Sequence, residues 1–186
     1  TYFHNLISPI ESPQAWQNYL NQDIQKQITQ GLYVGELENL LTHKSTLRDY
    51  FVETEIDIVA GGPPCQGFSM AGRRNPEDSR NLLPHQFLSF VRAANPKAVI
   101  MENVVGMRQR FAKHDVESPF SEIIKALGKV GKKYIVQPVQ LNAMHYGVPQ
   151  HRPRVMLIAV RKDIARQLGI SATDNLWNSK SFDKPA

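Results

Sequence analysis

The sequence predicts an α/β fold in one domain, and two observations indicate it. Short apolar runs of strand length alternate with stretches whose apolar residues recur at helical spacing, which is the rhythm of a parallel sheet with crossover helices. The chain has 186 residues, of which 41% are hydrophobic and 21% charged, so it holds enough apolar material for one core. No internal repeat interrupts the pattern.

The first third of the chain is predicted to be helical. A Ser-Pro pair at residues 12–13 is a helix start signal, and apolar side chains then keep helical spacing until Gly31. Residues 37–51 are likewise predicted to be mostly helical. These two helices precede the first predicted strand.

Strands and helices alternate in the remainder. Residues 56–60 and 98–101 are apolar runs that predict strands, and the helix between them covers residues 82–94. The inward side of that helix is predicted to carry four apolar residues: Leu83, Phe87, Leu88 and Val91. Ser118 and Pro119 begin the next predicted helix, which ends at Gly128.

Two β-rich runs follow this helix. Residues 134–141 and 155–160 are joined by a loop at residues 142–154, and we expect them to pair as antiparallel strands. From residue 171 the chain is polar, which is typical of a tail or linker.

The single cysteine, Cys65, follows the first predicted strand within the segment GGPPCQGFS at residues 61–69. A strand that ends in glycines and prolines delivers the next side chain into the crevice beyond the carboxyl edge of the sheet, where open α/β folds bind ligands. This placement indicates a nucleophile. A lone free cysteine is more often a small buried hydrophobic residue, and that alternative stays open on Cys65 alone.

Two other segments carry polar groups at strand ends. Glu102 follows the apolar strand at residues 98–101, where a buried charge is costly, so its carboxyl should be exposed, paired or protonated. Gln150, Arg152 and Arg154 alternate onto one face if the segment before residue 155 is extended. Such a face suits an anionic ligand or a base edge, although a helix cap, a surface pair or a solvated charged face would also explain these residues.

Three segments together, GGPPCQGFS at residues 61–69, ENV at 102–104 and QHRPR at 150–154, resemble in this order the conserved motifs of the cytosine-5 DNA methyltransferases. The segment DSRNLL at residues 78–83 is similar to another motif of that family. The resemblance covers residues 33–161 approximately. It implies a Rossmann-like sheet, largely parallel with an antiparallel strand pair near the end, in a partial catalytic domain at residues 1–170, with residues 171–186 leading toward a missing target-recognition region.

The resemblance also implies the chemistry. The thiolate of Cys65 adds to carbon 6 of cytosine, which makes carbon 5 reactive toward the methyl group of S-adenosylmethionine. Glu102 holds the amino edge of the base and supports protonation of ring nitrogen 3. An arginine of the QHRPR segment contacts the base carbonyl, and Arg152 and Arg154 together favour the thiolate.

The implied S-adenosylmethionine site is incomplete in this sequence. Family members carry a Phe-x-Gly-x-Gly loop after their first strand, and the first fifty residues contain no such turn. The remaining candidates for contact with this methyl donor are Pro64, Leu83 and Glu36. We therefore expect a second segment or chain to supply the missing motifs, and we expect no metal.

The expected partner is double-stranded DNA, because carbon 6 is reached only when the target base is extruded from the stack. A net charge of +5 and an isoelectric point near 9.4 permit this partner without requiring it. The sequence shows no signal peptide and no membrane span, and its lone cysteine fits a reducing compartment, so we expect a cytoplasmic protein. The resemblance further implies a bacterial, nucleoid-associated enzyme of a restriction-modification system.

Three alternatives were weighed against this function. A transfer-RNA cytosine methyltransferase uses similar motifs, but Gly-Phe-Ser at residues 67–69 is closer to bacterial DNA enzymes. A noncatalytic subunit would need a partner chain, and it would not require Cys65 and Glu102. A P-loop is excluded because Phe68 stands where the phosphate-binding lysine should be.

Overall fold

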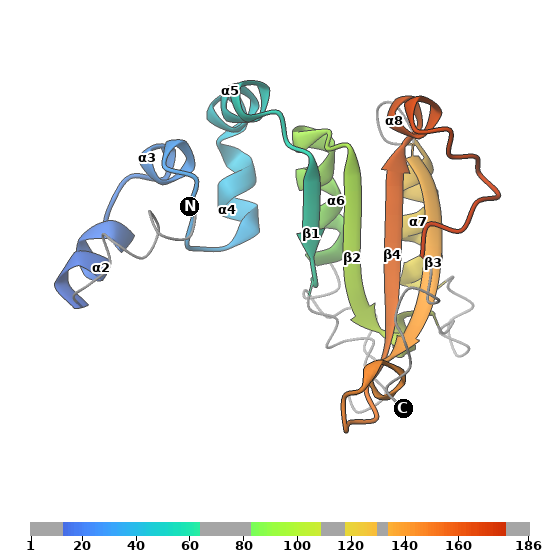
Figure 1. The fold of residues 1–186 in the computed structure, drawn as a ribbon. Coiled ribbons are helices and arrows are strands. Elements are labelled where there is room, and N and C mark those ends of the chain that lie inside the picture. Colours follow the sequence, from blue (N-terminus) through green and yellow to red (C-terminus); the bar gives the residue numbers. More distant parts are fainter. Residues whose placement is uncertain (1–12, 64–82, 109–117, 130–133, 178–186) are drawn as a thin grey trace. The chain divides into compact units, whose positions relative to one another are not determined.

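A computed structural model describes residues 13–63, 83–108, 118–129 and 134–177 (Figure 1). The chain separates into two compact units, Thr1–Glu55 and Ile56–Ala186. The domain limits expected from the sequence, residues 1–170 and 171–186, stay a prediction.

The first unit is helical, as predicted, but each of its two predicted helices is divided in two. The first becomes α2 (Pro13–Leu20) and α3 (Ile24–Thr29), and the break occurs at Asp23, whose Oδ1 accepts a hydrogen bond from the Gln25 N–H at 2.7 Å. An aspartate that caps a new helix competes with continuation of the old one. The second becomes α4 (Leu37–Thr42) and α5 (Lys44–Thr54), and His43 lies between them in a non-helical conformation.

The core of this unit is small. Helices α3 and α5 pack together, and four apolar side chains are buried: Ile28, Leu40, Leu47 and Phe51. Gln27 is also buried, and its side chain donates to the Gln22 carbonyl and accepts from the Val34 N–H. This amide therefore ties the connection after α3 back to the start of that helix.

The second unit contains a four-stranded sheet in the order β1-β2-β4-β3. The strands are β1 (Ile58–Gly61), β2 (Ala98–Val104), β3 (Tyr134–Asn142) and β4 (Pro153–Arg161). Strand β1 is parallel to β2, and β4 is antiparallel to both β2 and β3. Three strands therefore run in one direction and β4 alone runs against them, which confirms the predicted α/β sheet with an antiparallel strand pair near its end.

Strand β2 is three residues longer than predicted. It continues through Glu102 and Asn103 to Val104, because β4 is long enough to pair with these residues through Met156, Val155 and Arg154. The polar residues of the ENV segment thus lie within the sheet at its edge and not in a loop beyond it.

Helices α6 (Leu83–Ala94) and α7 (Pro119–Lys129) pack side by side against one face of the sheet (Figure 1). Of the residues predicted on the inward side of α6, Phe87, Leu88 and Val91 are buried and Leu83 is half-buried. From α7, Phe120, Ile123 and Leu127 are buried. They meet sheet residues that are fully buried: Val99, Met101, Val155, Leu157 and Ala159.

The amino edge of the sheet is held by polar contacts to the α6–β2 connection. The buried Tyr134 hydroxyl donates to the Pro96 carbonyl at 2.7 Å, and Arg161 Nη1 donates to the Asn95 carbonyl at 2.6 Å. Asn95 has a φ of 45°, a left-handed conformation that asparagine tolerates better than most residues. Helix α8 (Lys162–Gln167) begins directly after β4.

Residues 171–177, predicted as part of a tail or linker, return along β3. The Gln137 side chain accepts hydrogen bonds from the backbone N–H groups of Leu176 (2.7 Å) and Trp177 (3.2 Å). The Trp177 indole N–H donates to the Tyr146 hydroxyl at 3.3 Å, and the two rings meet edge to face. This part of the chain is therefore bound to the sheet unit.

Candidate active site

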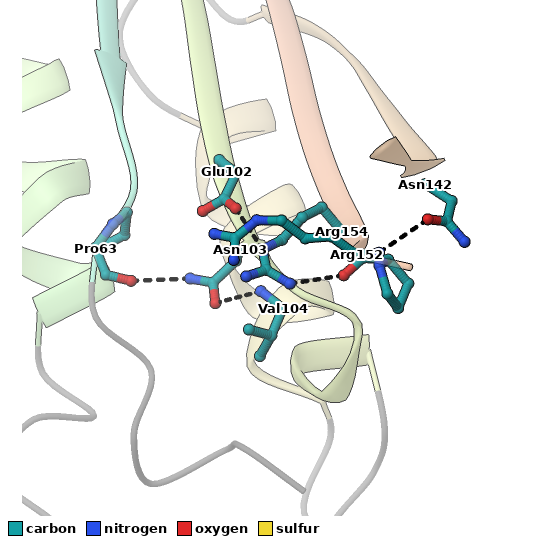
Figure 2. A network of polar contacts seen from close by, with 8 residues as sticks. Pro63, Glu102, Asn103, Val104, Asn142, Arg152 and Arg154 are labelled. Carbon is teal, nitrogen blue, oxygen red and sulfur yellow. Dashed lines mark hydrogen bonds and ion pairs between the residues drawn. The ribbon is translucent and has the colours of Figure 1, made fainter. Parts of the chain in front are cut away.

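Three of the polar residues singled out in the sequence lie where three strands meet the carboxyl edge of the sheet: Glu102, Arg152 and Arg154 (Figure 2). Strand β1 ends there at Gly61 and β2 ends there at Val104, because the two strands are parallel. Strand β4 begins at the same edge with Pro153, because it is antiparallel to β2. This edge is the usual ligand side of an open α/β sheet.

Glu102 and Arg154 form an ion pair at the centre of this edge. Their Oε1 and Nε atoms are 2.6 Å apart, and Arg154 Nη1 also donates to the Pro153 carbonyl at 2.9 Å. The Glu102 side chain is 41% exposed and that of Arg154 is 23% exposed. The carboxylate is thus oriented by the guanidinium while a large part of it stays open to a ligand, which confirms the expectation that it would be paired or exposed.

Gly62 leaves room for this carboxylate. A Cβ atom at residue 62 would lie 3.2 Å from Glu102 Oε2 and 3.6 Å from the Glu102 carbonyl oxygen. The first contact is closer than ordinary van der Waals contact, so a side chain there would press on the second carboxylate oxygen. The Gly-Gly turn therefore serves the Glu102 site as well as ending β1.

Asn103 links the ends of β1 and β2. It is only 2% exposed, and its Nδ2 donates to the Pro63 carbonyl at 2.9 Å while its Oδ1 accepts from the Val104 N–H at 2.8 Å. Sequence reasoning assigned no role to Asn103. The available signal was the strand alternation, which places Asn103 on the same buried face as Met101 and so requires partners for a buried amide.

Arg152 is held by its backbone and its side chain is exposed. Its N–H donates to Asn142 Oδ1 at 3.0 Å (Figure 2). Its carbonyl accepts from the Ala143 N–H at 3.2 Å. The predicted alternation of Gln150 with the two arginines is wrong. Strand β4 starts only at Pro153, and the Gln150 N–H turns back onto the Val148 carbonyl at 2.7 Å, so Gln150 is not part of an extended run.

Two of the other predicted site residues lie outside the described residues, and two lie at the starts of helices. Cys65 and Pro64 lie outside the described residues, directly after Pro63. Leu83 is the first residue of α6 and is half-buried. Glu36 is exposed and precedes α4 in the first unit, whose position relative to the sheet is not determined.

Within the described ranges, no group of three or more His, Cys, Asp or Glu residues is placed to hold a metal ion. Among the helices that the structure describes, none is long and apolar enough to cross a membrane.

Comparison with known proteins identifies the family. The family model of the C-5 cytosine-specific DNA methylases matches residues 16–185, which is most of the chain. The chain belongs to this family. The sequence resemblance is therefore confirmed, and the Glu102–Arg154 edge lies within the matched region of this methylase.

Curated relatives of the methylase are type II methyltransferases. M.AquIA of Picosynechococcus is 44% identical over 110 residues, which cover 58% of this chain and 44% of the relative. M1.HphI of Haemophilus parahaemolyticus is 36% identical over 165 residues, which cover 87% of this chain and 41% of the relative. The chain thus spans less than half the length of these relatives.

The fold is shared with a solved methyltransferase. A structure described as a DNA modification methyltransferase encoded within a prophage of E. coli superposes with a TM-score of 0.54 at 29% identity. The match covers 72% of this chain and 34% of that protein. It confirms the Rossmann-like methyltransferase fold predicted from the sequence.

Proposed function

We propose that this chain is the catalytic segment of a DNA (cytosine-5) methyltransferase that acts on a cytosine extruded from double-stranded DNA. The single observation that carries the proposal is the half-exposed Glu102 carboxylate, oriented by Arg154 beside the end of β1. In the sequence, Cys65 is four residues after β1 ends at Gly61 and two residues after Pro63. A carboxylate and a thiol near one another are the two groups that attack on a cytosine ring requires.

In this proposal the Cys65 thiolate forms a bond to carbon 6 of the base, and the ring electrons shift to carbon 5. Glu102 binds the amino edge and stabilises the proton on ring nitrogen 3, so that the ring accepts those electrons. S-adenosylmethionine, when bound, would supply an electrophilic methyl group to carbon 5, and its sulfonium–methyl bond would break to leave S-adenosylhomocysteine. Loss of the carbon 5 proton and of the thiolate then releases 5-methylcytosine and restores Cys65.

Arg154 positions Glu102, and the positive charge of Arg154 and Arg152 favours the thiolate over the thiol at Cys65. An arginine of this pair also contacts the base carbonyl. The Asn103 bond to Pro63 supports this geometry, since it fixes the backbone immediately before the residues that carry the thiol. The buried Asn103 amide thus links the end of β2, which carries Glu102, to the segment after β1, which leads to Cys65.

The methyl donor is proposed to contact Pro64, Leu83 and Glu36, and a further segment or chain supplies the remaining donor and DNA contacts. The matches cover less than half of these curated relatives, which supports this part of the proposal. The full enzyme is proposed to work on chromosomal DNA in the bacterial cytoplasm, within a restriction-modification system.

The experiment that tests the proposed function is covalent trapping. Duplex DNA that contains 5-fluorocytosine is mixed with S-adenosylmethionine and with the full-length protein, and separately with this chain. Fluorine at carbon 5 is not lost as a proton is, so the thiol adduct persists and migrates as a protein–DNA complex on a denaturing gel. We expect an adduct that Cys65→Ala abolishes. Absence of an adduct across many target sequences, with adduct formation on transfer RNA, would replace DNA by RNA as the substrate.

A further inference from the structure

The loop between β3 and β4 is closed at its base by one side chain. Asn142, the last residue of β3, has extended backbone angles and precedes the short 3-10 helix η4 (Ala143–Tyr146). Its Oδ1 accepts hydrogen bonds from the N–H of Met144 at 3.4 Å and from the N–H of Arg152 at 3.0 Å. The second bond joins residues ten positions apart and so closes the whole loop.

This closure fixes the backbone from which the two arginines project. The Arg152 N–H is held by Asn142, and the Arg152 carbonyl is held by the Ala143 N–H at 3.2 Å. The ladder between β3 and β4 begins at the next pair, Asn142 opposite Pro153. Arg154 is one residue further and reaches Glu102. Arg152, whose N–H is held by the Asn142 side chain, is thus only two residues before the arginine of the ion pair.

We propose that Asn142 is a positioning residue for Arg152 and Arg154. Its side-chain oxygen holds the loop in the one arrangement that presents the Arg152 side chain to the site edge and aims Arg154 Nε at Glu102. The effect of Asn142 on the order of the β3–β4 loop backbone is argued from the hydrogen bonds alone. Its effect on catalysis rests on the proposed function.

The two hydrogen bonds that Asn142 Oδ1 accepts, from the N–H groups of Met144 and Arg152, form the Asn142 clamp. Their chemistry allows a clear test by substitution. Both contacts use Oδ1 as an acceptor, and Figure 2 shows that oxygen turned toward Arg152 and Nδ2 turned away. Asn142→Asp therefore keeps an acceptor oxygen at the same place, whereas Asn142→Ala removes it and leaves two N–H groups to water. Asn39→Ala, which removes an exposed amide from α4 in the other unit, is the matched control.

Hydrogen exchange measured by nitrogen-15 NMR on this chain tests the clamp without any DNA. We expect the Arg152 amide and the Arg154 Nε–H to exchange about tenfold faster in Asn142→Ala, and at nearly the wild-type rate in Asn142→Asp and Asn39→Ala. Unchanged exchange in Asn142→Ala overturns the proposal. If that variant does not fold, fast exchange at Arg152 in Asn142→Asp overturns it, because the acceptor is still present.

Trapping kinetics test the catalytic consequence. At saturating 5-fluorocytosine DNA we expect the full-length Asn142→Ala protein to form the adduct about tenfold more slowly. Asn142→Asp should keep the maximal rate but need more DNA to reach half of it, since the added negative charge repels phosphates. A wild-type maximal rate in Asn142→Ala overturns the positioning role. Faster exchange in Asn142→Ala together with no adduct in the wild type would overturn the proposed function but would still support the hydrogen-bonding role of Asn142.

Discussion

At the scale of single residues, the Glu102 carboxylate combines two properties that seldom occur together. It is oriented by a guanidinium 2.6 Å away, yet 41% of its side chain is exposed. A carboxylate needed only for stability would gain little from such an exposed pair. Its arrangement suits a group that must meet a ligand in one fixed orientation.

Substitution of Glu102 should therefore affect the reaction more than the fold. Glu102→Gln keeps the shape and loses the charge that stabilises a proton on the base, so the maximal rate of 5-fluorocytosine trapping should fall about 100-fold. Glu122→Gln on α7 is the matched control, because the Glu122 side chain is similarly exposed at 46%. Equal loss of rate in both variants would mean that the effect is one of general charge and not of this carboxylate.

The buried hydroxyl of Tyr134 predicts how the free energy of unfolding changes at alkaline pH. Burial raises the pKa of Tyr134 from 10.0 to about 12, while nearby Arg161 opposes the rise and Asp163 adds to it. The folded state thus holds this proton more tightly than the unfolded state does. The stability that the protonated hydroxyl contributes is fully present below pH 10 and is lost as the pH rises from 10 to 12.

Urea unfolding of wild type and Tyr134→Phe between pH 7 and pH 12 checks this. At pH 7 the variant should lose about 1–2 kcal/mol, because the Pro96 carbonyl loses its donor. Above pH 10 the difference between the two proteins should shrink. A constant difference across the whole pH range would show that the Tyr134 proton is not linked to folding.

At the scale of elements, the contact between β1 and α6 depends on a glycine. A Cβ atom at residue 61 would lie 2.7 Å from Cε2 of Phe87, whose ring is buried and has little room to move. Gly61→Ala should therefore destabilise the sheet unit by about 1–3 kcal/mol. The control is Gly128→Ala in α7, where no heavy atom lies within 4 Å of the added carbon.

Thermal unfolding distinguishes the two alanine variants. Gly128→Ala should raise the melting temperature slightly, because alanine favours a helix interior over glycine by about 1 kcal/mol. Gly61→Ala should lower it. A melting temperature for Gly61→Ala equal to that of wild type would mean that Phe87 repacks without cost.

The junction of β4 and α8 carries an acid-sensitive pair. The hydrogen bond from Arg161 at 2.8 Å, helped by backbone N–H groups at the start of α8, lowers the pKa of Asp163 from 3.8 to about 2. The folded state therefore favours the carboxylate, and the stability this contributes is present above pH 4 and lost as the pH falls from 4 to 2. Circular dichroism during acid titration should show a shallower loss of structure in Asp163→Asn. An identical acid transition would place the acid sensitivity elsewhere.

At the scale of the whole molecule, the net charge of +5 predicts how binding to the proposed DNA partner responds to salt. Two or more phosphate contacts imply that affinity falls about tenfold or more between 50 mM and 200 mM salt. Fluorescence anisotropy with labelled duplex DNA measures this dependence. Affinity that does not change with salt would exclude backbone contacts as the main source of binding.

The sequence predicted the sheet well and the helical unit less well, for a physical reason. Strands such as β2 and β4 are buried, so their apolar runs are long and clear. Glu102 directly follows the apolar run of β2, so its place at the carboxyl edge of the sheet could be predicted. The helix breaks at Asp23 and His43 depend on local hydrogen bonds and backbone angles that hydrophobic spacing does not report. The roles of Asn103 and Asn142 depend on contacts with residues that the fold brings close, and no pattern in one segment reveals them.

The position of β4 has a consequence for the order in which the sheet assembles during synthesis. This strand is the last of the four in the chain, yet it lies between β2 and β3 and separates them. During synthesis β2 and β3 have no common neighbour until residue 161 has left the ribosome, and Glu102 lacks its Arg154 partner until 52 more residues have been added. Such distant pairing is slow and exposes unpaired strand edges to other chains meanwhile. A nascent chain therefore lacks the Glu102–Arg154 pair until β4 is in place, and it is most prone to aggregate just before that point.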